Sequence, residues 1–153
     1  MTLDLPDLHA TESLGARIAG VLRPGDAVLL SGPLGAGKSA LARAVLRTLL
    51  ADPALDVPSP SYTLVQAYDA PWGTVWHFDL WRLDDPRALE ELGWDGAQDD
   101  AVIVEWPDRL PAPPLGALHI TLALAAGDAR RATLDGWAER VGWAEREGWA
   151  GQL

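Results

Sequence analysis

The sequence predicts an α/β fold with three layers, in which helices pack on both sides of a mixed, mainly parallel central sheet. Two apolar runs, residues 26–31 and 101–104, have the length and composition of strands that are buried on both faces. Helical patterns at 11–22 and 39–50 flank the first run, and later strand-like segments favour antiparallel pairs toward the C-terminal half. The chain of 153 residues is long enough to bury one proper core.

The first predicted helix precedes the first apolar run. Thr11 is placed to cap this helix, and Leu14, Ile18 and Leu22 recur at helical spacing on the face that we expect to be buried. A turn at 23–25, Arg-Pro-Gly, ends the helix and leads into the strand.

A glycine-rich loop joins the strand at 26–31 to the helix at 39–50. Residues 32–39 read Gly-Pro-Leu-Gly-Ala-Gly-Lys-Ser and fit the phosphate-binding pattern G-x-x-x-x-G-K-[ST] at every fixed position. Backbone N–H groups of such a loop, and of the helix that follows, point at a bound phosphate chain. The motif therefore predicts a fold like that of the P-loop NTPases. The residues that we expect to bind the nucleotide are Pro33, Leu34, Gly35, Ala36, Gly37, Lys38, Ser39 and Ala40.

Lys38 is the only lysine in the chain, whose other strongly basic side chains are all arginine. A compact ammonium can reach between two phosphates, whereas the planar guanidinium has the wrong shape to replace it there. We expect Lys38 to contact the β- and γ-phosphates of ATP and the Ser39 hydroxyl to ligate magnesium.

The second half of the chain alternates strand-like segments with turns and one short helix. The spacer at 70–73, Ala-Pro-Trp-Gly, predicts a hairpin between its flanking strands. The expected elements are strands at 62–68 and 74–78, a helix at 86–92, a strand at 101–104, a Pro-rich surface loop at 107–114, and strands at 117–124 and 129–134.

Two acidic residues end predicted strands. Glu105 follows the run at 101–104, and Asp79 follows the strand at 74–78. Carboxyl ends of parallel strands share the sheet edge where the phosphate loop also lies, so Glu105 has the position of a Walker B carboxylate that holds magnesium and orients the attacking water. Asp79 is a second catalytic candidate beside Lys38 and Glu105, and the alternative for either acid is one that only terminates a strand at the surface. We interpret the neighbouring His77 as a strand residue with a satisfied hydrogen bond, with a catalytic base as the alternative.

The ordered set of motifs resembles the TsaE (YjeE) family over roughly residues 10 to 135. The segments that carry the resemblance are 32–39, the Ser-Pro-Ser-Tyr-Thr-Leu-Val segment at 59–65, His-Phe-Asp-Leu-Trp-Arg-Leu at 77–83, Glu-Leu-Gly at 91–93 and Val-Glu-Trp-Pro-Asp-Arg at 104–109. That family is the small ATPase subunit of the bacterial machinery that makes threonylcarbamoyladenosine on tRNA.

The resemblance implies particular roles and partners. It implies that Ser39 and Glu105 bind magnesium, that Asp79 matters for ATP turnover, and that residues 59–63 form a loop sensitive to the γ-phosphate. It also implies TsaB-like and TsaD-like partner subunits, and an ATP hydrolysis that resets their complex rather than performing the carbamoyl transfer.

Charge and composition limit where such a protein works. The formal net charge of −10 disfavours independent binding to a nucleic-acid backbone, so we expect tRNA to be reached only through partners. No apolar stretch is long enough to span a bilayer, and the N-terminus lacks the basic start of a signal peptide, so no membrane role and a cytoplasmic location are expected.

The last 18 residues form a second unit by composition. We expect residues 1–135 to be the P-loop ATPase domain and residues 136–153 to be a tail built on the hexad Gly-Trp-Ala-Glu-Arg-x. Six residues turn an ideal helix by about 600°, so the repeated tryptophans would not share a helical face. The tail is either a permissive repeat expansion or a segment that docks a partner or packs on the protein itself.

Three other functions are alternatives to this interpretation. A GTPase needs an N-K-x-D motif, for which no lysine remains after Lys38. A small-metabolite kinase could use Arg82, Arg87 and Arg109 to clamp a phosphoryl group, although no arginine-rich lid is evident. A nucleotide-gated binding module with negligible turnover cannot be separated from a slow ATPase by sequence.

Overall fold

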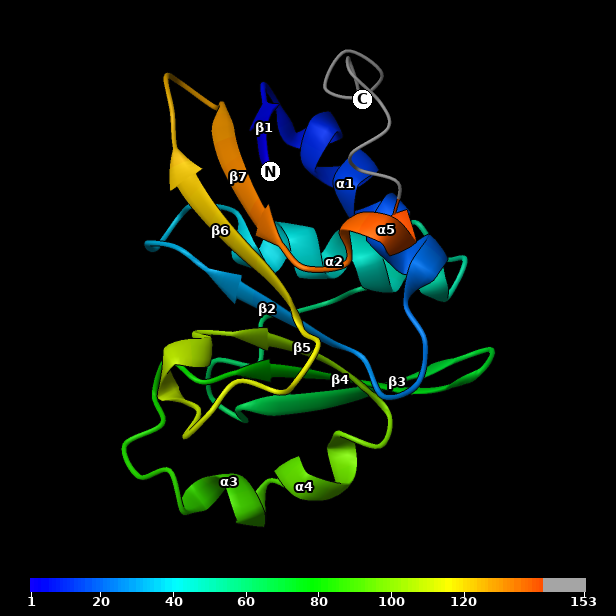
Figure 1. The fold of residues 1–153 in the computed structure, drawn as a ribbon, viewed down its shortest axis with the longest axis vertical. Helices are drawn as coiled ribbons and strands as arrows, with labels where there is room; N and C mark the ends of the chain where they lie inside the picture. Colours follow the sequence, from blue (N-terminus) through cyan, green and yellow to red (C-terminus); the bar gives the residue numbers. More distant parts are fainter. Residues whose placement is uncertain (142–153) are drawn as a thin grey trace.

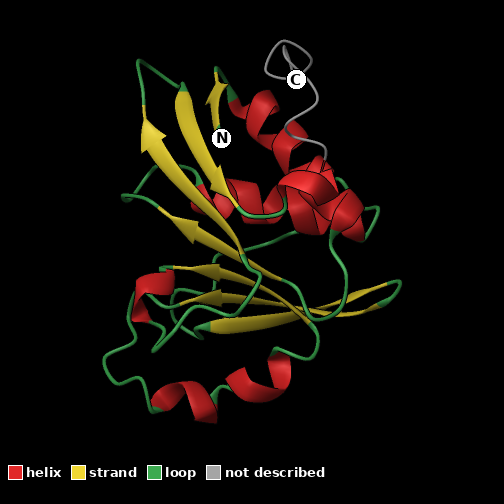
Figure 2. Ribbon diagram, viewed as in Figure 1, coloured by secondary structure: helices red, strands yellow, loops and turns green. Residues whose placement is uncertain are grey.

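The computed structural model describes residues 1–141 as a seven-stranded sheet between two layers of helices (Figure 1 and Figure 2). The strand order is β1-β7-β6-β2-β5-β4-β3. The strands are β1 (Thr2–Leu5), β2 (Ala27–Ser31), β3 (Val65–Ala70), β4 (Gly73–Asp79), β5 (Ala101–Glu105), β6 (Leu118–Leu124) and β7 (Arg130–Asp135). The helices are α1 (Leu8–Val21), α2 (Lys38–Leu49), α3 (Ala88–Glu91), α4 (Trp94–Ala97), the 3₁₀ turn η1 (Pro107–Arg109) and α5 (Ala138–Val141).

The centre of the sheet is parallel and both of its margins are antiparallel. Strands β6, β2, β5 and β4 are joined by parallel pairs, whereas β3 pairs with β4, β7 with β6, and β1 with β7 in antiparallel fashion. Five of the seven strands therefore run in one direction, which confirms the mixed, mainly parallel sheet. The antiparallel pairs occur at both margins and not only in the C-terminal half.

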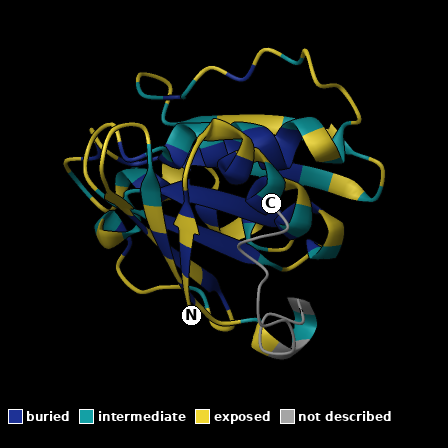
Figure 3. Ribbon diagram, turned by 90° about the horizontal axis from the view of Figure 1, so that it is seen from above, coloured by how far each residue is buried: buried dark blue, intermediate teal, exposed yellow. Residues whose placement is uncertain are grey.

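Two hydrophobic clusters lie on opposite faces of the sheet. Along β2 and β5, alternate residues enter different clusters, because successive side chains of a strand point to opposite faces. Val28 and Ile103 pack under α1 and α2, while Leu29 and Val104 pack against the layer of α3 and α4. Figure 3 shows these central strands buried between the helices. The short apolar runs of the sequence thus reflect burial on both faces.

Several elements begin elsewhere than predicted. Thr11 does not cap α1: it is buried inside the helix, and Asp7 caps it by accepting a hydrogen bond from the Ala10 N–H at 2.9 Å. The hairpin at 70–73 is confirmed, but β3 begins only at Val65, because Leu64 has a positive φ of 67° that is incompatible with an extended strand. Strand β1 and helix α4 were not predicted, since each has only four residues and too short a pattern to show a period.

The first hexad of the tail packs against the domain. The indole N–H of Trp137 donates to the Gly116 carbonyl at 2.8 Å, and the Arg140 guanidinium lies 4.3 Å from the Trp137 ring. Arg140 also pairs with Asp26 and donates to the Val21 carbonyl at 2.6 Å. The self-packing alternative therefore describes this first repeat, while the later repeats lie outside the described residues.

Candidate nucleotide-binding site

The glycine loop adopts the conformation that its sequence predicts. Gly37 precedes α2 with φ 101° and ψ 16°, a left-handed conformation that favours glycine. At Gly32, φ is 143° and a Cβ atom would collide with the Leu122 carbonyl of β6, so the loop lies directly against the sheet. Ala36 is fully buried beneath the loop, and its N–H donates to the Pro33 carbonyl at 3.1 Å. The strand, loop and helix are thereby fixed relative to one another.

Lys38 folds back over the loop that precedes it. Its Nζ atom donates to the carbonyls of Gly32 and Pro33 at 2.6 and 2.9 Å, and lies 4.3 Å from the centre of the Trp106 ring. Burial lowers the pKa of the ammonium, while the negative charges of Glu105 and, secondarily, Asp79 raise it. Phosphate oxygens are stronger acceptors than these neutral carbonyls, so the ammonium can exchange one set of partners for the other.

The two predicted acids lie next to each other at one edge of the sheet. In the parallel pairing of β4 with β5, Asp79 is opposite Glu105 and His77 is opposite Ile103. Since side chains alternate along a strand, His77, Asp79 and Glu105 all face the layer of α1 and α2. All three are buried, with at most 4% of their surface exposed. Neighbouring strands thus each end with a buried carboxylate at the same edge of the sheet.

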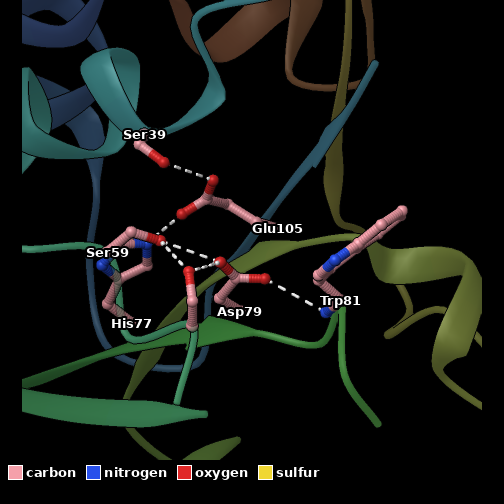
Figure 4. Close-up of polar contacts among 7 residues, drawn as sticks. Ser39, Ser59, His77, Asp79, Trp81 and Glu105 are labelled. Carbon is pink, nitrogen blue, oxygen red and sulfur yellow. Dashed lines mark hydrogen bonds and ion pairs between the residues drawn. The ribbon is translucent and has the colours of Figure 1, made fainter. Parts of the chain in front are cut away.

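Glu105 links the loop helix to β4 (Figure 4). The Ser39 hydroxyl donates to Oε1 of Glu105 at 2.8 Å, and Nε2 of His77 lies 2.7 Å from Oε2. A hydroxyl and a carboxylate oxygen at this distance are the hard ligands that magnesium takes from a protein, with water and phosphate oxygens completing its shell. Ser39 and Glu105 therefore fit the metal site that the sequence predicts.

Asp79 contacts a different segment, the turn at 59–61. The hydroxyls of Ser59 and Ser61 both donate to its Oδ2 atom, at 2.8 and 3.1 Å. The backbone N–H of Trp81 donates to Oδ1 at 3.1 Å. Both carboxylate oxygens are thus engaged, and this acid fastens a loop to the end of β4 (Figure 4).

These groups surround one pocket of about 320 Å³. Of the eight residues predicted to bind the nucleotide, Pro33 and Ala36 do not line it. The lining residues are Leu34, Gly35, Gly37, Lys38, Ser39, Ala40, Ser59, Ser61, Asp79, Trp81, Glu105 and Trp106.

Comparison with known proteins identifies the family. The family model described as "Threonylcarbamoyl adenosine biosynthesis protein TsaE" matches residues 5–133. The chain belongs to the TsaE family. A curated TsaE from Nostoc is 30% identical over 88% of each chain, and one from Haemophilus influenzae is 34% identical over 71% of this chain and 72% of its own.

Two further relatives complete the comparison. A TsaE from Rickettsia conorii is 36% identical over 69% of this chain, and the match spans 62% of the Rickettsia protein. The crystal structure of YdiB from Bacillus subtilis superposes with a TM-score of 0.73, at 21% identity, over 95% of this chain and 96% of the other. The YdiB match shows that the two proteins share a fold.

The TsaE-family pocket contains aromatic residues that the site prediction missed. Trp106 has a positive φ of 59°, and its ring lies over Lys38. It also packs against Trp81, with ring centres 4.4 Å apart and the ring planes tilted by 42°. The sequence signal that Trp106 belongs to the site was its position directly after Glu105, a predicted site residue. The backbone reversal that makes it part of the site could not be predicted from that proximity.

A second hollow adjoins the TsaE-family pocket through Gly37 and Ala40, which line both. It lies between the start of α1 and the turn that joins β6 to β7, where Arg130 donates to the Gly35 carbonyl at 3.2 Å. Its other lining residues are Asp7, Leu8, Thr11, Asp128 and Arg130. Elements remote in sequence thus extend the site beyond the loop.

Within residues 1–141, no helix is long and apolar enough to cross a membrane.

Proposed function

We propose that this chain binds ATP with magnesium, hydrolyses it slowly on its own, and thereby serves threonylcarbamoyladenosine biosynthesis on tRNA in the cytoplasm. One observation carries the proposal: Lys38, Ser39 and Glu105 converge on a single pocket above the phosphate loop. Membership of the TsaE family supports the tRNA modification pathway, for which its curated members are named.

The phosphate end of the nucleotide belongs in the pocket of Lys38. Lys38 would leave the carbonyls of Gly32 and Pro33 for the β- and γ-phosphates, and Ser39 and Glu105 would hold magnesium. A magnesium ion held by Ser39 and Glu105 would supply positive charge that offsets the negative charge of the phosphates. Trp81 and Trp106 cover this end and limit the access of water.

The nucleoside end belongs in the second hollow. A nucleotide whose γ-phosphate lies near Glu105 passes Ala40 at the start of α2, and Ala40 is shared by both hollows. Leu8 then offers an apolar surface to the base, and the polar side chains of Thr11 and Asp128 are available to the ribose.

Turnover is proposed to act through other proteins. With a net charge of −10, the chain has few cations to replace counterions on tRNA. TsaB-like and TsaD-like subunits are the proposed partners that hold the RNA, and ATP hydrolysis resets their complex.

The binding module with negligible turnover remains the second candidate, supported by the contacts of Asp79. Both of its carboxylate oxygens already accept hydrogen bonds, from Ser59, Ser61 and the Trp81 N–H. Among the described residues, Asp79 therefore holds the loop in place rather than serving as a free base. The kinase has less support, because none of its three arginines lines the pocket. Arg87 pairs with Asp85, Arg109 donates to the Leu83 carbonyl, and Arg82 lies over Tyr62.

Calorimetry with magnesium-ATP and magnesium-GTP tests the proposal directly. We expect ATP to bind more tightly than GTP, and the purified chain to bind tRNA weakly. Mixing with TsaB and TsaD from the same organism should give an ATP-dependent complex with altered hydrolysis. Equal affinity for GTP, or phosphoryl transfer to a small acceptor without those proteins, contradicts the proposal; undetectable hydrolysis in every mixture favours the binding module.

A further inference from the structure

The imidazole of His77 is buried, and only one of its two nitrogens has a hydrogen-bond partner among the described residues. The residue is 1% exposed, and its Nε2 atom lies 2.7 Å from Oε2 of Glu105. Nδ1 is buried without a hydrogen-bond partner among the described residues. Such an unpaired atom in a native core requires a physical reason.

The two nitrogens can be assigned from these contacts. A proton on Nδ1 would leave a buried N–H with no acceptor, and would place the Nε2 lone pair against a carboxylate oxygen. A proton on Nε2 avoids both problems, because Nε2 then donates to Glu105 and Nδ1 keeps only an unshared lone pair. The contacts therefore assign a proton to Nε2, which donates to Glu105.

This donor determines how the two oxygens of Glu105 are used. Oε2 is held from the β4 side by His77, and Oε1 is turned toward Ser39 at 2.8 Å. We propose that His77 is a positioning residue, which fixes the rotation of the Glu105 carboxylate so that Oε1 faces the Ser39 hydroxyl and the magnesium site. This inference rests on the proposed function, since it assigns the metal to Ser39 and Glu105.

The alternative is that His77 only fills space in the core. A leucine of similar size would fill it without burying a polar ring, and would leave the Glu105 carboxylate, which is 2% exposed, without its second partner. The positioning role and the space-filling role therefore predict different effects for a variant that removes the N–H donor of His77 but keeps the volume of its side chain.

Two substitutions separate these roles. His77→Gln keeps an N–H donor at a reach close to that of Nε2, whereas His77→Leu removes it. We expect His77→Leu to weaken magnesium-dependent binding of a non-hydrolysable ATP analogue by about tenfold or more, as for other residues that orient a metal ligand. Binding of the analogue in EDTA should be unchanged, and His77→Gln should stay within about threefold of wild type.

Three controls make the outcomes distinct. In a Glu105→Gln background, His77→Leu should cause no further loss of the magnesium effect. If wild type shows no magnesium-dependent binding, the proposed function itself is wrong and the inference is overturned with it. If wild type shows magnesium-dependent binding and His77→Leu binds equally well, only the positioning role is overturned. The same holds if His77→Leu and His77→Gln lose equal amounts of binding and their thermal stability falls in parallel.

A spectroscopic measurement tests the same inference without nucleotide, and it does not require the His77→Leu variant to fold. Long-range proton–nitrogen correlation spectra of the wild-type protein report the tautomer of each of its three histidines. The signals of His77 are identified by their loss in His77→Gln. We expect a proton on Nε2, and a ring protonated on Nδ1 alone would overturn the inference.

Discussion

Glu105 and Asp79 end neighbouring strands, are paired in register and are both buried, yet they bind different parts of the chain. Glu105 meets Ser39 of the phosphate loop, whereas Asp79 meets the hydroxyls of Ser59 and Ser61. One carboxylate thus belongs to the proposed metal site, and the other holds a loop that lines the same pocket. Equivalent positions on a sheet do not imply equivalent chemistry, because the contacting loops decide what each acid does.

Removal of Lys38 should cause the largest loss of ATP binding. Lys38→Ala deletes the ammonium whose pKa both carboxylates raise, and with it the charge-assisted hydrogen bonds that are proposed to reach the phosphates. We expect a loss of about 3 kcal/mol in ATP binding, roughly a hundredfold, measured by calorimetry. The control is Arg131→Ala, which removes an exposed ion pair with Asp4 and should leave binding unchanged. ATP affinity retained in Lys38→Ala would contradict the site.

Neutralising Glu105 should affect turnover more than binding. Glu105→Gln keeps the size of the side chain but removes the charge beside Ser39, so we expect the barrier to ATP hydrolysis to rise by about 2 to 4 kcal/mol. Steady-state hydrolysis and ATP binding in EDTA measure the two effects separately. Unchanged hydrolysis would remove Glu105 from the proposed chemistry.

Neutralising Asp79 should instead loosen the loop. Asp79→Asn loses the charge that accepts both serine hydroxyls, a change of about 1 to 2 kcal/mol, so hydrogen exchange of residues 59–63 should accelerate by about tenfold. Exchange in α2 and the magnesium requirement should stay as in wild type. The comparison fails if Asp79→Asn changes the magnesium requirement as strongly as Glu105→Gln does.

The smallest expected effect is on the titration of Lys38. Burial holds the pKa of its ammonium below the usual value of 10.5, and Glu105 opposes this more than Asp79 does. Glu105→Gln should therefore lower the pKa of Lys38 further than Asp79→Asn does. Because the chain has a single lysine, selective isotope labelling gives one ammonium signal to follow by NMR. An equal shift in both variants would contradict the ranking of the two charges.

The same pKa predicts a dependence of stability on pH. At pH values just below 10.5, Lys38 is still mostly protonated in the unfolded chain but has begun to lose its proton in the folded chain. The unfolded state then binds more protons, so the free energy of unfolding rises with pH within that window. Wild type should gain stability relative to Lys38→Met as the pH rises toward 10.5, as measured by chemical denaturation.

The phosphate loop, the buried strands and the carboxylates at their ends could all be predicted from the sequence. Residues 32–39 follow β2 directly and begin α2, so their function depends on neighbours along the chain. Burial on both faces is likewise visible as an apolar run, because it constrains every residue of the strand. Such local and periodic features can be predicted without knowing which segments pair.

The contacts among these groups could not be predicted in this way. His77 and Glu105 are 28 residues apart, and Ser59 and Asp79 are 20 apart, so their contacts depend on strand order and register. The prediction that Thr11 caps α1 was wrong for a related reason. Thr11 is buried against the rest of the molecule, and α1 begins earlier in the chain, after its cap Asp7. Trp106 reaches Lys38 only through one left-handed residue. These choices are made by long-range packing, which composition and periodicity do not record.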